Sequence, residues 1–154
     1  MYPLAEDNAM ATVQDLLDRK GTDVHAIGPD ASVIDAAQLM NQHGVGGLLV
    51  LGGEGEILGI FTERDILRRV VAAGLDATRI KVGDVATPEV ITCLPATSLD
   101  ECAAIMSSRR VRHLPVVSAA GLHGLVTSGD VLAHRVAESE ATIEYMNSYM
   151  FDIR

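Results

Sequence analysis

An internal repeat constrains the fold of this chain more than any other feature of its sequence. SVIDAAQLM at 32–40 aligns with SLDECAAIM at 98–106, a shift of 66 residues. VGGLLVLGGEGEILGIFTERDIL at 45–67 then aligns with VRHLPVVSAAGLHGLVTSGDVL at 111–132, with one residue fewer in the second copy. We therefore expect two similar units of about sixty residues, each too small to be very stable alone.

The two copies predict the same order of secondary-structure elements. Ser32 and Ser98 are typical N-caps, and apolar residues follow each of them at helical spacing. Apolar runs on either side of a turn predict a β-hairpin in each copy, at 48–51 with 57–61 and at 114–117 with 122–126. Shorter runs predict one further helix and one further strand per copy, at 13–17 and 24–27, and at 82–86 and 90–93. The order is helix, strand, helix, strand, strand, helix, twice, which is a mixed α/β (α+β) fold.

The composition indicates how the two copies pack. Hydrophobic residues make up 48% of the 154-residue chain, whereas aromatic residues make up 3% and tryptophan is absent. The interior must therefore consist of Val, Leu, Ile, Ala and Met. Two small copies are expected to share one core about an approximate two-fold axis, so that equivalent positions face each other across clefts.

The charge of the chain argues against two classes of partner. There are 21 acidic and 12 basic residues, giving a formal net charge of −9, which repels both a nucleic-acid backbone and an anionic membrane surface. The sequence has no apolar signal segment at its start and no uninterrupted apolar span of membrane length. Cys93 and Cys102 lie in apolar patterns typical of buried, unreactive thiols. We expect a cytoplasmic protein that binds neither nucleic acid nor membrane.

The last predicted strand of each copy runs into a T-x-x-D motif, in GIFTERDIL at 59–67 and GLVTSGDVL at 124–132. In one interpretation the motif is a capping box, in which Thr62 or Thr127 accepts a backbone hydrogen bond and Asp65 or Asp130 reaches back from N3. In the other it binds a ligand, because a carboxylate accepts hydrogen bonds from the vicinal hydroxyls of a ribose and a helix N-terminus favours phosphate. The two roles are compatible, and the repetition of the motif after an apolar strand favours ligand contact.

The repeat with G-h-h-T-x-x-D (h apolar) at its last strand-to-helix junction resembles the CBS-domain family. The resemblance covers residues 12–137, and its most specific stretches are GIFTERDIL, RHLPVV and GLVTSGDVL, in that order. The tandem resembles a CBS pair, or Bateman module. The resemblance implies a regulatory, signal-transducing module that binds an adenine nucleotide (AMP, ATP or NAD(H)) and senses cellular energy or redox state, with no catalytic cofactor.

The resemblance also implies roles for individual residues. In the family the T-x-x-D residues hold ribose or phosphate, which implies such contacts for Thr62, Asp65, Thr127 and Asp130. Main-chain groups on the first strand of each copy typically read the adenine edge, which by position implies His25 or Ala26 in the first copy and Ile91 or Thr92 in the second.

The two expected sites differ in charge. The second copy has Arg112 and His113 where the first has Gly46 and Gly47. Arg112 and His113 are candidate phosphate contacts, the alternative being a solvated edge of the second hairpin. Gly46 and Gly47 would let the backbone approach a ligand closely, although tight packing explains them as well.

A second difference lies inside the motif, where Glu63-Arg64 of the first copy is replaced by Ser128-Gly129. Arg64 is a further candidate ligand contact. We expect the sites to differ in preference, with a mononucleotide in one and a dinucleotide such as NAD(H) in the other. Stand-alone CBS pairs that look like this chain are associated with AMP and NADH.

Motifs for catalysis are missing from the sequence. The five histidines show no metal-ligand spacing, and no glycine-rich stretch has a dinucleotide-binding or P-loop spacing. We predict no catalytic residues and no metal site, and an enzyme that processes nucleotides is the least favoured alternative. The other alternative is a structural dimerisation module, or a regulatory subunit, that binds no nucleotide.

The end of the chain predicts a long helix from Ser128 through the stretch ending in FD. Its apolar positions recur at steps of four and three, typical of a coiled-coil seam, at Leu132, Val136, Ser139, Ile143, Met146 and Met150. A homodimer is the simplest partner for this seam, and the alternative is a helix folded back on its own module. The expected organisation is a tail at 1–11, repeats at 12–76 and 77–137, and a helical extension at 138–154, acting on a downstream protein that the sequence does not identify.

Overall fold

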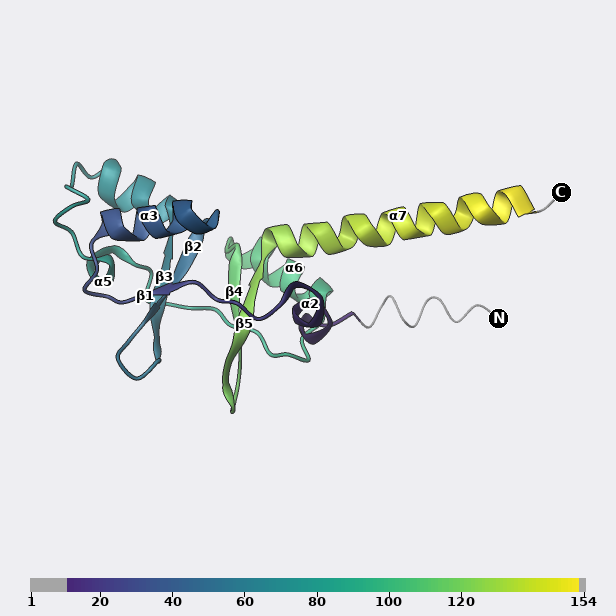
Figure 1. Cartoon of the computed structure of the whole chain (residues 1–154), viewed down its shortest axis with the longest axis horizontal. Coiled ribbons are helices and arrows are strands. Elements are labelled where there is room, and N and C mark those ends of the chain that lie inside the picture. The colour runs from purple at the N-terminus through teal and green to yellow at the C-terminus, as the bar shows by residue number, and fades with distance from the viewer. Residues whose placement is uncertain (1–10, 153–154) are drawn as a thin grey trace. The chain divides into compact units, whose positions relative to one another are not determined.

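A computed structural model describes residues 11–152, with side chains described to residue 148 (Figure 1). The chain divides into two compact units. Asp23–Ile91 form one, named here the Thr62 unit after its T-x-x-D motif, and residues 11–22 with 92–152 form the other, the Thr127 unit. Each unit combines helices with a small sheet, so the predicted mixed fold is confirmed.

The Thr62 unit is built on a three-stranded sheet of order β1-β2-β3. Because β1 is parallel to β2 and β2 is antiparallel to β3, the starts of β1 and β2 lie at the same edge as the end of β3. The T-x-x-D motif follows β3 and therefore lies at this edge. The elements in chain order are β1 (Ala26–Ile27), α3 (Val33–His43), β2 (Gly47–Leu51), β3 (Ile57–Thr62), α4 (Glu63–Asp65), the π-helix η1 (Ile66–Val71) and α5 (Val82–Val85).

The Thr127 unit is built on one antiparallel hairpin, β4 with β5. Its second T-x-x-D motif stands where β5 ends and a long helix begins. The elements in chain order are α2 (Val13–Lys20), α6 (Leu99–Arg109), β4 (His113–Ser118), β5 (Gly121–Thr127) and α7 (Ser128–Asp152). The hairpin and α7 are the green to yellow segments of Figure 1.

The first helix of each sequence repeat packs in the unit formed by the other repeat. In the Thr127 unit, the backbone N–H of Val13 at the start of α2 donates to Thr97 O over 2.8 Å. In the Thr62 unit, the equivalent N–H of Val82 at the start of α5 donates to Ala31 O, also over 2.8 Å. The compact units therefore differ from the proposed repeats 12–76 and 77–137 in where each first helix belongs.

The helices α3 and α6 begin and end at equivalent residues. The side chains of Ser32 and Ser98 cap them, as predicted, by accepting a hydrogen bond from the N–H three residues on. Both end in a left-handed residue, which is Gly44 (φ 64°) after α3 and Arg110 (φ 55°) after α6. Glycine adopts this conformation without strain, whereas arginine does not.

The predicted first strand of each copy is shorter in the structure. The strand expected at 24–27 is reduced to Ala26–Ile27, and the one expected at 90–93 is reduced to a single parallel bridge between Cys93 and Val116. The second strand stops because the chain turns at once. The Leu94 N–H donates to Thr97 Oγ1, and Pro95 has no N–H to extend a ladder.

The long C-terminal helix is confirmed, since α7 runs from Ser128 to Asp152. Every residue from 139 to 148 is exposed. The predicted seam residues whose side chains are described are all exposed, and they include four large apolar ones, Leu132, Val136, Ile143 and Met146. Met150 lies outside the residues whose side chains are described. None of the described helices has the length and apolar character needed to cross a membrane.

Candidate functional site

The T-x-x-D motif of the Thr62 unit forms a complete capping box. Thr62 N–H donates to Asp65 Oδ2 over 3.0 Å, and Asp65 N–H donates back to Thr62 Oγ1 over 3.4 Å. The Thr62 hydroxyl also lies 3.3 Å from Asp65 Oδ2. Asp65 is the buried member of this site, with 9% of the residue exposed. The capping interpretation of the sequence is therefore confirmed here.

The second oxygen of Asp65 is held by residues outside the motif. Thr87 Oγ1 donates to Asp65 Oδ1 over 3.3 Å, and Arg69 Nε lies 3.7 Å from the same oxygen. The Arg69 guanidinium also donates to Val85 O over 3.3 Å. Both carboxylate oxygens of Asp65 are therefore engaged by the protein itself, and a ligand hydroxyl would compete with the Thr87 hydroxyl for Oδ1.

The motif of the Thr127 unit has the same local bonds and a different outside partner. Thr127 N–H donates to Asp130 Oδ2 over 2.9 Å, and Asp130 N–H donates to Thr127 Oγ1 over 3.1 Å. Lys20 Nζ, from the end of α2, lies 2.5 Å from that same Oδ2. Within the described part of the chain, no donor contacts Asp130 Oδ1, so this oxygen remains able to accept a hydroxyl.

The environment of Asp130 favours its ionised form. Burial by itself would raise the pKa of this carboxyl, but the hydrogen bonds from Lys20 and Thr127 outweigh burial and lower the pKa below its ordinary value of 3.8. Asp130 is therefore a carboxylate at neutral pH, paired with one ammonium group.

The candidate residues of the two hairpins stand at equivalent places beside the motifs. Gly47 pairs with Thr62 across the β2–β3 ladder, and His113 pairs with Thr127 across the β4–β5 ladder. The carbonyl oxygen of Gly46 accepts from the N–H after Thr62 over 3.0 Å, and that of Arg112 accepts from the N–H after Thr127 over 2.9 Å. The structure thus brings each pair next to its own T-x-x-D motif.

The side chains at these equivalent places differ in size and charge. A Cβ on Gly46 would lie 3.2 Å from Glu63 Oε1, so the glycine leaves room for an acidic side chain at the first site. In the second copy Ser128 replaces Glu63, and Arg112 replaces Gly46. Arg112 is exposed, and His113 is half-buried. The exchange gives the first site an acidic residue beside its motif and the second site a basic one.

The residues expected to read an adenine edge are less well placed by the structure. The carbonyl oxygen of His25 accepts from Leu49 N–H over 3.1 Å, and its ring stacks on His43 with the ring centroids 4.0 Å apart. Ala26 lies in β1, opposite Leu49. Ile91 ends the Thr62 unit, whereas Thr92 begins the second segment of the Thr127 unit, and neither lies in a strand.

A comparison of the chain with known protein families identifies the family to which these motifs belong. The CBS domain, as a family, matches residues 12–72 and again residues 82–137. Both matches end beyond the T-x-x-D motif of their copy. The chain belongs to the CBS-domain family. The predicted tandem of two CBS domains is therefore confirmed, and such tandems typically bind adenine nucleotides for regulation.

Individual CBS-domain proteins resemble the chain over most of its length. The mitochondrial CBS domain-containing protein CBSX3 of Arabidopsis thaliana is 35% identical over 147 residues, which cover 90% of this chain and 71% of that protein. The crystal structure of the CBS-domain containing protein ATU1752 of Agrobacterium tumefaciens has a TM-score of 0.79 at 36% identity, covering 88% of this chain and 98% of the other. A crystal structure of CBSX2 in complex with AMP has a TM-score of 0.68 at 28% identity, covering 84% and 98%.

A third T-x-x-D sequence in this CBS chain is a plain capping box. Thr12 N–H donates to Asp15 Oδ2 over 3.0 Å, and Asp15 N–H donates to Thr12 Oγ1 over 3.3 Å, at the start of α2. Within the described residues, which begin at 11, no strand precedes it. The cap geometry alone therefore does not distinguish a ligand site, and the surroundings of each motif carry the difference.

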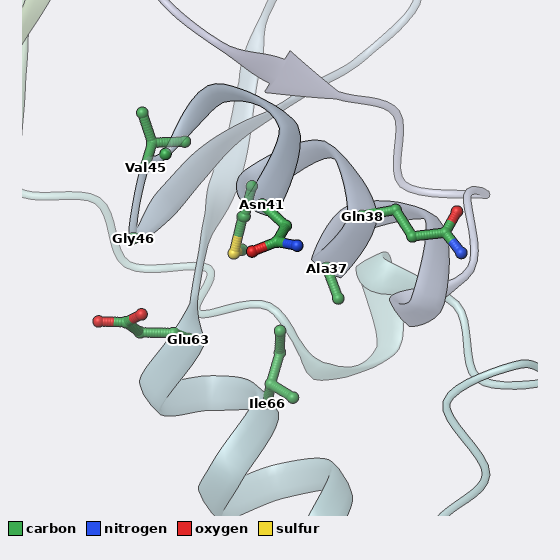
Figure 2. A pocket seen from close by; sticks show the side chains of 9 residues that line it. Ala37, Gln38, Asn41, Val45, Gly46, Glu63 and Ile66 are labelled. Carbon is green, nitrogen blue, oxygen red and sulfur yellow. The ribbon is translucent and has the colours of Figure 1, made fainter.

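A pocket of about 700 Å³ adjoins the first CBS motif without containing it. Figure 2 shows Ala37 of α3 and Ile66 of η1 facing each other, with Glu63 on the side of Gly46. Its polar side chains are Gln38, Asn41 and Glu63, and none of the described residues that line it is cationic. Thr62 and Asp65 are not among its lining residues, so this pocket is not assigned to ribose binding.

Sequence reasoning missed the outside partners of the two carboxylates. Arg69 stands four residues after Asp65, a spacing at which helical side chains meet, so this ion pair was open to prediction. Lys20 and Thr87 carry no such signal. Each lies in or just after the first helix of a repeat, and only the packing of that helix in the other unit brings it to a T-x-x-D motif.

The two thiols and the possible metal ligands among the described residues do not form a reactive site. Cys93 and Cys102 are buried free thiols, as predicted. Hydrogen bonding to Cys102, together with burial, raises the pKa of Cys93, which keeps its thiol protonated. Across residues 11–152, no group of three or more His, Cys, Asp or Glu side chains is placed to hold a metal ion.

Proposed function

We propose that this CBS pair is a regulatory module that binds an adenine nucleotide, AMP, ATP or NAD(H), at its T-x-x-D motifs and thereby senses cellular energy or redox state. The observation that carries the proposal is the second motif. It presents an ionised Asp130 with one open oxygen, the Thr127 hydroxyl and neighbouring cations at one helix start. The AMP complex of the related CBSX2 supports the same ligand class.

The chemistry of each residue follows from its type and place. Asp130 would accept the vicinal hydroxyls of a ribose, and Arg112 and His113 would lie beside its phosphate. At the first motif, Asp65 would do the same in competition with the Thr87 hydroxyl, with Arg64 beside the phosphate. Gly46 and Gly47 would admit the ligand close to the backbone, and main-chain groups at His25, Ala26, Ile91 and Thr92 would read the adenine edge.

Regulation requires the ligand to prefer one conformation of the protein. A nucleotide shifts an equilibrium only by its difference in affinity for the two states. In this proposal the protein transmits that shift to a downstream protein and does not transform the nucleotide. The two free thiols support a reducing compartment such as the cytoplasm.

The seam of α7 supports a homodimer. Leu132, Val136, Ile143 and Met146 leave between 48% and 63% of their surfaces exposed, at coiled-coil spacing. In a parallel pair this spacing places Arg135 of one copy beside Glu140 of the second copy, and the opposite charges favour that partner. Ile143→Glu is expected to dissociate the dimer in analytical ultracentrifugation, whereas Ala141→Glu on another face of α7 should leave it intact.

One observation favours the alternative of a structural dimerisation module that binds no nucleotide. Both motifs are complete capping boxes formed by the protein's own groups, like the box formed by Thr12 and Asp15. In that case substitution of Asp65 or Asp130 would change stability alone.

Isothermal titration calorimetry separates the two functions. Protein checked to be free of bound nucleotide is titrated with AMP, ATP, NAD, NADH and S-adenosylmethionine. Saturable binding that weakens at least tenfold in Asp130→Ala or Asp65→Ala, but not in the matched cap variant Asp15→Ala, is the expected result for loss of a charge-assisted contact. Binding of none of the five ligands by folded, nucleotide-free protein would leave dimerisation as the function.

A further inference from the structure

Helix α2 belongs to the first sequence repeat but packs in the Thr127 unit, and this packing brings a lysine to the second T-x-x-D site. Lys20 Nζ lies 2.5 Å from Asp130 Oδ2, the oxygen that also accepts the Thr127 N–H over 2.9 Å. The two charged side chains are 28% and 23% exposed, which places the pair partly within the protein. An ammonium group has three N–H donors, and Asp130 takes one of them.

The position of Lys20 is fixed by the packing of its helix. Val13, Leu16 and Leu17 of α2 are buried, and the backbone at the start of α2 is bonded to the turn before α6. The neighbouring Arg19 contacts His134 Nδ1 on α7. Lys20 therefore reaches Asp130 from a helix that is anchored at both ends.

The charge around the two motifs differs as a result. At the second site Lys20 balances Asp130, and the adjacent Arg112 adds a positive charge that no described carboxylate pairs with. At the first site Arg69 lies near Asp65, but its guanidinium also binds Val85 O, and Glu63 adds a negative charge beside Gly46. A phosphate group would be attracted to the second site, whereas at the first site the negative charge of Glu63 opposes the attraction of Arg64.

We propose that Lys20 determines the specificity of the Thr127 site, making it select phosphorylated over unphosphorylated nucleosides. Lys20 neutralises Asp130 next to the phosphate and offers it a free N–H, while Asp130 Oδ1 takes the ribose hydroxyls. This inference rests on the proposed nucleotide-binding function and adds to it a ligand class for one site. It assigns the first site, with its acidic neighbour, a weaker preference for phosphate.

Titration of adenosine, AMP and ATP against matched lysine variants tests the inference. The heat lost in Asp130→Asn identifies binding at the Thr127 site. Lys20→Gln is expected to weaken AMP binding there about tenfold while changing adenosine binding less than twofold, because only AMP contacts the ammonium group. Lys20→Arg should restore the preference. Lys81→Gln, which removes the exposed lysine paired with Asp30, is the control and should match the wild type.

Each other outcome has a distinct meaning. Suppose that wild-type protein binds AMP, but that Lys20→Gln weakens the binding of AMP and adenosine equally or weakens the binding of neither. Lys20 then has no role in specificity, and the proposed function stands. If folded wild-type protein binds none of the three ligands, the inference and the proposed function both fail. Lys20→Met, which keeps the alkyl stem, provides a second variant, and the salt dependence of its AMP affinity should be flatter than that of the wild type.

Discussion

The two T-x-x-D motifs of this CBS pair form the same local structure and differ in what contacts it from elsewhere in the chain. Each places an aspartate at N3 of a helix, bonded to the backbone and hydroxyl of its threonine. Asp65 then receives the neutral hydroxyl of Thr87, with the guanidinium of the nearby Arg69 at 3.7 Å, whereas Asp130 receives the ammonium group of Lys20 at 2.5 Å. A local motif therefore fixes the cap, and the residue that reaches the cap from a distant segment differs between the two sites.

The largest expected loss of stability comes from substituting the glycine that lies three residues before the threonine of each T-x-x-D motif. A Cβ on Gly59 would lie 2.6 Å from the backbone oxygen of Thr87, which is itself bonded to Ile60 N–H, whereas a Cβ on Gly124 would lie 2.8 Å from a methyl group of Leu17. The Leu17 side chain can change its rotamer to relieve the contact, whereas the hydrogen-bonded backbone at Thr87 cannot move as easily. We expect Gly59→Ala to lower the free energy of unfolding by about 3 kcal/mol and Gly124→Ala by about 1 kcal/mol.

Urea unfolding followed by circular dichroism measures both variants. Equal losses would mean that the segment around Thr87 moves as freely as the Leu17 side chain, and the comparison between the two sites would lose its structural basis.

A smaller difference is expected between the two aspartates. Asp65 is buried and has both oxygens engaged, so Asp65→Ala leaves several donors unsatisfied and should cost about 2 kcal/mol of unfolding free energy. Asp130→Ala removes a cap and a partly exposed ion pair and should cost about 1 kcal/mol. Thermal melts of both variants beside Asp15→Ala, an ordinary cap variant, check the order, and a larger loss in Asp130→Ala would reverse it.

The charged partner makes the second site sensitive to acid. The pKa of Asp130 is lowered from 3.8, so its ion pair adds stability above that pH and loses it as the pH falls through the lowered value. Lys20→Met is expected to cost about 1 kcal/mol at pH 7 and progressively less as the pH falls through the lowered pKa of Asp130 and its carboxylate becomes protonated. Melting curves across this range, with Lys81→Met as control, measure the effect. An effect of Lys20→Met that is independent of pH would assign it to packing of the lysine stem.

An effect no larger than these concerns the left-handed residues after α3 and α6. Arg110 has φ 55°, where its counterpart Gly44 has φ 64°. Arg110→Gly should stabilise the protein by about 1 kcal/mol, since glycine adopts this conformation without strain, and Gly44→Ala should destabilise it by a similar amount. Thermal melting measures both. Destabilisation by Arg110→Gly would mean that the arginine side chain contributes more than its backbone strain costs.

Much of the fold was predictable because it is encoded locally and encoded twice. The caps Ser32 and Ser98, the two hairpins and the helix from Ser128 were all read from spacing and turn residues, and the structure confirms them. The strand at 90–93 was not predictable in its length, because a turn closed by Leu94 and Thr97 ends it at Cys93. Apolar spacing alone does not reveal such a turn.

The candidate sites were predictable only in part. The T-x-x-D motifs and the flanking residues at 46–47 and 112–113 were found from the repeat, and the structure places each pair beside its own motif. The correlated change that puts Glu63 with Gly46 and Ser128 with Arg112 is visible in the alignment of the two copies. Its meaning required the structure, in which a Cβ placed on Gly46 would lie 3.2 Å from Glu63 Oε1.

The sequence by itself determined the repeat, the order of the elements and the capping boxes, because these depend on residues within a few positions of one another. Tertiary structure decided which unit each first helix joins, and so which group meets each carboxylate. Thr87 lies 22 residues from Asp65, and Lys20 lies 110 residues from Asp130. No local preference connects residues so far apart. Burial of the apolar face of α2 in the Thr127 unit brings Lys20 to Asp130.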